Sequence, residues 1–88
     1  MKVVFNEPMP GPAPIPLSEL PLGASARVVA IDAGPALIQR LEALGFLPET
    51  EVACRRRAPL GDPRVYELRG TQLCLRRSEA ARIRVRPR

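Results

Sequence analysis

The residues best able to bind an anion stand together at positions 55–63, which read RRRAPLGDP. Three consecutive arginines beside a glycine could grip phosphate. A phosphate cradle, however, needs several glycines followed by a helix N-terminus, whose N–H groups hold the anion. Here the single Gly61 is followed by Asp62, Pro63 and a strand-like segment. The pattern therefore favours the end of one strand, a turn and the start of the next strand.

Few other residues could carry catalytic or metal chemistry. The chain has no histidine, which is the commonest general base and metal ligand. Its two cysteines, Cys54 and Cys74, form no CxxC pair, and its carboxylates are dispersed along the chain. We therefore predict no catalytic residue, no cofactor and no metal site, so the chain is not expected to be an enzyme. A disulfide between the two cysteines, or an iron–sulfur site shared by two copies through one of them, stays an alternative.

The chain of 88 residues carries a net charge of +5, from 14 basic and 9 acidic residues. This charge is compatible with binding to RNA, DNA or an acidic protein, and equally with a solvated arginine-rich surface. Only three residues are aromatic, and two of them, Phe46 and Tyr66, are expected to be buried. Because single-stranded nucleic acid is commonly bound by exposed aromatic rings, nucleic acid is the less favoured partner.

The N-terminal segment differs in composition from the rest. Residues 6–16, NEPMPGPAPIP, carry a proline at every second position. Because proline fixes φ and lacks an N–H donor, we expect residues 1–16 to be a flexible proline-rich leader and residues 17–88 to be the domain. No segment resembles a signal peptide or approaches the roughly 18–20 apolar residues of a membrane span, so a reduced, cytoplasmic protein is predicted.

The remaining sequence predicts short strands around one helix. Apolar residues recur at helical spacing between Leu37 and Leu44, and Pro35 suits the first turn, so residues 35–44 are expected to form a helix that ends at Gly45. Alternating apolar and polar residues predict five strands, at residues 25–31, 50–57, 64–69, 71–76 and 83–86. Single helical turns are expected at residues 17–21 and 78–82.

Five short strands are too few for a sandwich, but they can remove their exposed edges by curling into a barrel. We therefore predict a mainly β fold with one short helix, a small β-barrel of about five strands. Arg55 and Arg57 are expected to point to solvent, and Arg56 to lie on the core face with its aliphatic stem over apolar surface. The side chains predicted to point inward are Val28, Ala30, Leu37, Leu41, Val52, Cys54, Tyr66, Leu68, Leu73, Leu75, Ile83 and Val85.

Five segments in a fixed order carry a further signal: LSELPLG at 17–23, QRLEALGFLPET at 39–50, RRRAPLGDP at 55–63, LRG at 68–70 and LCLRRSEAARIRV at 73–85. This series resembles the FeoA family, the small cytoplasmic proteins of bacterial ferrous iron transport. The resemblance implies an SH3-like β-barrel and a non-enzymatic role with FeoB, the membrane ferrous iron permease that carries a cytoplasmic GTPase domain. The family is also similar to a domain of iron-dependent repressors, so an indirect iron sensor is an alternative, although it would be expected beside a helix-turn-helix.

The resemblance therefore implies a protein–protein interaction module that acts on the FeoB permease or its GTPase domain and reaches the membrane through that partner. The runner-up function is a basic SH3-like barrel that binds nucleic acid; no small-molecule substrate is expected, and a homo-oligomer is left open. Leu47 and Leu60 are apolar yet lie in predicted turns, where they either meet the partner or cap the two ends of the barrel. The predicted contact surface is Arg40, Leu44, Gly45, Leu47, Pro48, Leu60, Gly61 and Asp62.

Overall fold

The computed structural model describes residues 2–4 and 12–88 of the chain. The prediction of a mainly β fold with one helix of about three turns is confirmed. The five predicted strands correspond to β3 to β7, and the predicted helix corresponds to α1. Each of these elements begins and ends within one residue of its predicted bounds. In chain order, the elements are β1 (Lys2–Val4), β2 (Ile15–Pro16), the 3-10 helix η1 (Leu17–Glu19), β3 (Ser25–Asp32), α1 (Pro35–Ala43), β4 (Glu51–Arg57), β5 (Arg64–Leu68), β6 (Thr71–Leu75), the single-turn helix α2 (Arg77–Ala80) and β7 (Ile83–Pro87).

Two short strands lie within the segment predicted as a leader. β2 pairs antiparallel with β7, and β1 pairs antiparallel with the far end of β3. Ile15 of β2 is partly buried and packs against the core. The rest of that segment, Met1 and residues 5–11, lies outside the described residues, so the division into a leader over 1–16 and a domain over 17–88 stays a prediction.

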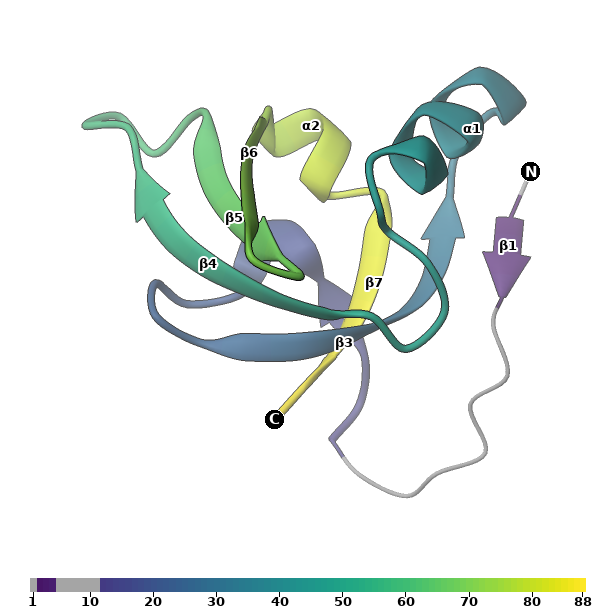
Figure 1. Cartoon of the computed structure of the whole chain (residues 1–88), viewed down its shortest axis with the longest axis horizontal. Coiled ribbons are helices and arrows are strands. Elements are labelled where there is room, and N and C mark those ends of the chain that lie inside the picture. The colour runs from purple at the N-terminus through teal and green to yellow at the C-terminus, as the bar shows by residue number, and fades with distance from the viewer. Residues whose placement is uncertain (1, 5–11) are drawn as a thin grey trace.

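The strands form one antiparallel sheet in the order β2–β7–β3–β4–β5–β6, with β1 beside β3. The sheet curves strongly, and both helices lie along the same side of the molecule (Figure 1). Between residues 12 and 88 no strand pairing joins β6 to β2, so hydrogen-bonded strands do not close the predicted barrel. Side chains from β5 reach η1 instead: the Tyr66 hydroxyl donates to the carbonyl of Leu17 at 3.4 Å, and Arg64 Nη1 donates to the carbonyl of Leu20 at 3.5 Å.

The core lies inside the curved sheet and under the two helices. Ten of the twelve side chains predicted to point inward are buried, and the other two, Leu37 and Leu73, are half-buried against the core. Leu17, Leu20 and Phe46 are fully buried as well. Phe46 follows α1 and its N–H donates to the carbonyl of residue 41 at 3.1 Å, so the helix end is fixed to the core.

A β-bulge in β4 makes the predicted orientation of Arg56 wrong. Cys54 pairs with Tyr66, but Arg56 pairs with Val65, so Arg55 is an extra residue in this strand. An extra residue shifts the alternation of faces by one position. Arg55 and Arg56 therefore lie on the outer face together, and both are exposed.

Candidate functional site

The structure divides the predicted contact surface into two parts. The first, which we call the α1-end surface, comprises Arg40, Leu44, Gly45, Leu47 and Pro48, on α1 and the connection that follows it. The second, which we call the hairpin tip, is the turn of residues 58–62 between β4 and β5, and it contains Leu60, Gly61 and Asp62. α2 lies between the two parts (Figure 1), and of the eight predicted residues only Arg40 and Asp62 line the hollow beside it.

The α1-end surface is built around the point where the helix stops. Gly45 has a φ of 113°, a conformation that favours glycine, and it turns the chain so that Phe46 enters the core. Leu44 is left on the outside with 40% of its surface exposed, while Leu47 is half-buried and Pro48 is exposed. Three apolar residues thus stand within five positions of the chain, at a helix end that Phe46 anchors to the core.

The hairpin tip holds its apolar side chain entirely in solvent. Leu60 is 96% exposed, so it caps neither end of the curved sheet. The turn is fixed by backbone hydrogen bonds from the N–H of Gly61 to the carbonyl of Ala58 at 2.7 Å and from the N–H of Ala58 to the carbonyl of Pro63 at 3.0 Å. Gly61 adopts a φ of 85°, which a residue with a side chain rarely adopts.

Polar contacts around α2 engage two of the predicted site residues. The Asp62 carboxylate accepts a hydrogen bond from the N–H of Arg77, the first residue of α2, at 2.9 Å. Glu79 accepts one from the N–H of Arg76 at 3.0 Å and pairs with the guanidinium of Arg40. The hydrogen bond from the N–H of Arg76 is the main cause that lowers the pKa of Glu79 below its ordinary value; burial opposes it, and Arg40 adds to the lowering. Arg40 and Asp62 therefore both stabilise α2.

A hollow of about 480 Å³ lies where these elements meet. Cys74 opens onto it as an exposed free thiol, whereas Cys54 is a buried free thiol, so the two cysteines form no disulfide with each other. The two carboxylates that line it are those of Asp62, which accepts from the N–H of Arg77, and Glu79, which pairs with Arg40. The residues that line the hollow are Arg40, Asp62, Pro63, Cys74, Leu75, Arg76 and Glu79.

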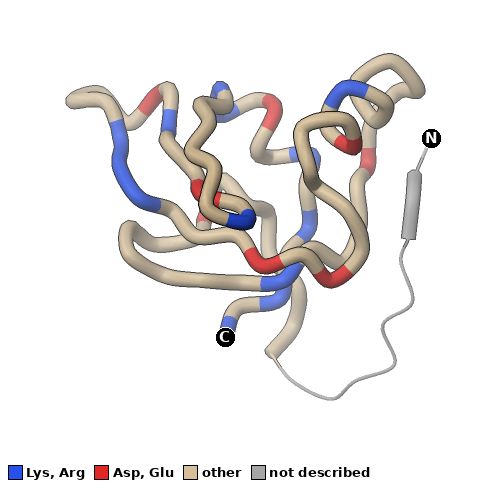
Figure 2. The backbone as a smooth tube through the Cα atoms, in the orientation of Figure 1, with Lys and Arg blue, Asp and Glu red and all other residues tan. Residues whose placement is uncertain are grey.

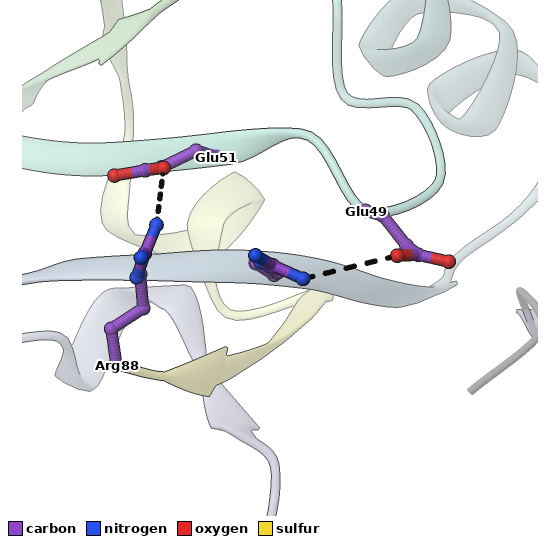
Figure 3. A network of polar contacts seen from close by, with 4 residues as sticks. Glu49, Glu51 and Arg88 are labelled. Atoms are coloured by element: carbon purple, nitrogen blue, oxygen red, sulfur yellow. Dashed lines mark hydrogen bonds and ion pairs between the residues drawn. The ribbon is translucent and has the colours of Figure 1, made fainter. Parts of the chain in front are cut away.

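A second hollow, of about 440 Å³, lies on the outer face of β3, β4 and β5 and is rich in carboxylates. Arginines face these carboxylates: Arg88 Nη1 lies 2.6 Å from Glu51, and Arg27 Nη1 lies 4.0 Å from Glu49 (Figure 3). In the same way, Arg55 Nε lies 2.9 Å from a Glu67 oxygen. Over residues 2–4 and 12–88, no group of three or more histidine, cysteine, aspartate or glutamate residues is placed to hold a metal ion.

Sequence reasoning missed the part that α2 plays in the site. A single helical turn was predicted there, and Glu79, three residues after Arg76, accepts from the N–H of Arg76 as the acidic residue of a capping box does. No sequence signal could show that Asp62, 15 residues away, binds the next N–H.

Comparisons with known proteins agree with the sequence resemblance. The model of the FeoA domain matches residues 15–87. An FeoA-like protein from Clostridium acetobutylicum is 32% identical, with a TM-score of 0.79 over 85% of this chain and 87% of that one. FeoA from Chlorobium tepidum is 40% identical, with a TM-score of 0.77 over 83% of this chain and 70% of that one.

A third solved structure adds a description of the fold. FeoA from Stenotrophomonas maltophilia, complexed with zinc, is 40% identical, with a TM-score of 0.70 over 78% of this chain and 86% of that one. It is described as a prokaryotic SH3 domain protein proposed to act as a bacterial ferrous iron transport activating factor. No protein of curated function matches this chain.

These matches identify the fold family of the chain and, with it, a non-enzymatic role. The fold is SH3-like, as predicted, and FeoA proteins are non-enzymatic accessory proteins of transport. No helix in the described part of the chain is long and apolar enough to cross a membrane. With a matching domain model over most of its length and relatives up to 40% identical, the chain belongs to the FeoA family.

Proposed function

We propose that this chain is a non-enzymatic cytoplasmic accessory protein of ferrous iron uptake that binds the cytoplasmic GTPase domain of the FeoB permease. Two findings support the proposal. The chain belongs to the FeoA family, and its relative from Stenotrophomonas maltophilia is described as a proposed ferrous iron transport activating factor. Its curved sheet would complete an SH3-like barrel through the contacts that Tyr66 and Arg64 of β5 make with the carbonyls of Leu17 and Leu20.

The observation that carries the proposal is the exposure of Leu44 at the α1-end surface. An apolar residue that is 40% exposed, beside Leu47 and Pro48, offers a small hydrophobic patch on a rigid support. Such patches mark protein–protein contacts when polar residues surround them. Arg40 on one side and Glu49 on the other supply this polar rim.

Of the two parts of the predicted surface, the α1-end surface is better suited to a folded partner. A stable interface buries roughly 800 Å² on each side, which requires a broad surface. The α1-end surface adjoins α2 and the hollow of about 480 Å³, so a partner could extend its contact across them. The hairpin tip is a narrow turn with a single large apolar side chain.

The test is a titration of the chain with the purified GTPase domain of the permease from the same organism, with and without a GTP analogue. We expect saturable binding that persists at physiological salt. Leu44→Ser should weaken it about tenfold, as loss of a central apolar contact commonly does. Leu22→Ser is the matched control, because Leu22 is 51% exposed in the η1–β3 connection, and it should leave binding unchanged.

Two results would contradict the proposal. Equal binding by the Leu44→Ser variant would remove the α1-end surface from the interface. Binding that disappears at physiological salt and that RNA reproduces would favour the nucleic acid function, because phosphate contacts give affinity a steep salt dependence.

A further inference from the structure

The hairpin tip presents a leucine that no part of the described structure covers. Leu60 is 96% exposed, far more than Leu22 at 51% or Leu44 at 40%, the other exposed large apolar residues in the described part of the chain. Burial of a leucine side chain stabilises a fold, and this leucine contributes none of that stabilisation. The side chain therefore gains stabilisation only from a contact with another molecule or surface.

The turn is built to keep that side chain outside. Ala58 and Gly61 are held by the backbone hydrogen bonds of the turn, and Arg64 Nε adds a contact to the carbonyl of Gly61 at 3.4 Å. On the other side of the turn, Asp62 is fastened to α2 through the N–H of Arg77. Because both flanks are fixed, Leu60 cannot fold back onto the core without breaking these contacts.

Positive charge surrounds the base of the tip. Arg55, Arg56 and Arg57 end the strand that leads into the turn, where Figure 2 shows a run of basic residues; all three are exposed. The bulge places the first two on the same outer face. Residues 55–69 contain five arginines and two carboxylates.

The two carboxylates in this segment are already engaged. Asp62 faces the N–H of Arg77 at 2.9 Å, and Glu67 faces Arg55 Nε at 2.9 Å. They therefore add little repulsion towards an anionic surface. Because Glu67 pairs with Arg55, the attraction to such a surface comes mainly from Arg56 and Arg57, which no carboxylate of the described residues faces.

We propose that the hairpin tip is a contact site for an anionic lipid bilayer. In this arrangement Leu60 enters the boundary between headgroups and acyl chains, and the arginines at the end of β4 bind lipid phosphates. An exposed apolar side chain with arginines at its base suits this interface, because basic residues are attracted to the anionic headgroups while the apolar side chain enters the acyl boundary. This inference goes beyond the proposed function, since it needs no protein partner.

Other partners explain fewer of these observations. A narrow turn offers too little area for a stable protein interface of its own. RNA would use the arginines but would make little use of Leu60, since unpaired RNA bases are bound by stacking on aromatic rings or arginine planes and by hydrogen bonds to their edges. Only a lipid surface uses the leucine and the arginines together.

The experiment uses a reporter that the chain itself allows. The sequence contains no tryptophan, so Leu60→Trp places a single tryptophan at the hairpin tip of the full chain. Leu22→Trp is the matched control at another exposed leucine. Each variant is titrated with vesicles of pure phosphatidylcholine and with vesicles in which roughly a third of the lipid is phosphatidylglycerol, the anionic component that attracts basic residues.

We expect the Leu60→Trp emission to shift to shorter wavelength with the anionic vesicles only, and the Leu22→Trp emission to stay unchanged. In co-sedimentation of the chain without a tryptophan reporter, Leu60→Ser should lower the affinity for anionic vesicles about tenfold. A tenfold loss equals roughly half to most of the free energy that a leucine side chain gains when it is buried. Arg57→Gln should lower it about fivefold through the lost charge.

Three results would overturn the inference. The first is unchanged Leu60→Trp emission with anionic vesicles. The second is vesicle binding that Leu60→Ser does not weaken. The third is a Leu60→Trp shift caused by the isolated GTPase domain without lipid, which would assign the tip to the protein partner. Lipid binding and GTPase-domain binding are measured separately, so either proposal can fail without the other.

Discussion

The Asp62 carboxylate accepts a hydrogen bond from the backbone N–H of Arg77 at 2.9 Å, across 15 residues of chain. Arg77 is the first residue of α2, where backbone N–H groups have no partner within the helix. The contact joins the hairpin tip to the element that separates it from the α1-end surface. A residue predicted to bind a partner thus has a clear structural role.

Asp62→Ala should therefore destabilise the fold by about 1 kcal/mol, the usual cost of losing a side-chain cap at a helix start. Asp62→Asn should retain most of the stability, because its amide oxygen can accept the same hydrogen bond. Urea denaturation of both variants checks this. If Asp62→Ala were as stable as the natural chain, the contact would contribute nothing to the fold.

The lowered pKa of Glu79 makes the stability of the fold depend on pH in the acidic range. Because the folded pKa lies below the ordinary value of 4.5, folding favours the carboxylate, and the stabilisation is present above that value. It is lost as the pH falls through the lowered pKa. Glu79→Gln should therefore be less stable than the natural chain near neutral pH, and the difference should shrink in acid. A constant difference at all pH values would contradict this.

Tyr66 should limit stability in alkali. Burial raises the pKa of its phenol from 10.0 to about 12, while the nearby Arg64 opposes the rise. A raised pKa means that the stabilisation is complete below pH 10 and is lost as the pH rises towards about 12, by on the order of 2 kcal/mol. Tyr66→Phe should remove this loss. Its neutral-pH cost should be about 1 kcal/mol, from the missing hydrogen bond to Leu17.

The comparison of thermal unfolding for Tyr66→Phe and the natural chain across this alkaline range is the measurement. Both proteins carry the same lysine and arginines, so the general alkaline loss cancels. Parallel curves for the two proteins would show that the Tyr66 phenol does not carry the effect.

Thr50→Val should stabilise the fold. Thr50 Oγ1 is buried and, within residues 2–4 and 12–88, has no hydrogen-bond partner. A buried unsatisfied hydroxyl costs roughly 1–3 kcal/mol, and valine has nearly the same shape without it. We expect the unfolding free energy from urea denaturation to rise by about 1 kcal/mol. A loss of stability would show that the hydroxyl has a partner such as a bound water.

Much of the fold could be predicted because the relevant signals are local. The helix over 35–43 follows from apolar spacing, Pro35 and Gly45, and the strands follow from alternation. The bulge at Arg55 could not be predicted, because it depends on how β4 meets β5 rather than on β4 alone. The same holds for β2, whose pairing with β7 joins distant parts of the chain.

The candidate site was harder to predict than the fold. Leu47 and Leu60 could both be identified as apolar residues in predicted turns, but their surroundings depend on the curvature of the sheet. The structure half-buries Leu47 and leaves Leu60 in solvent, although the two looked alike in sequence. The role of Asp62 at α2 needed the three-dimensional arrangement as well.

The central claim is that the α1-end surface binds the GTPase domain of the permease. The most direct test follows the backbone amide resonances of the isotope-labelled chain while the unlabelled GTPase domain is added at physiological salt. We predict saturable shifts concentrated at residues 40–48, with residues 55–62 little affected. Shifts confined to the arginine-bearing strands, or no shifts at all, would contradict the account.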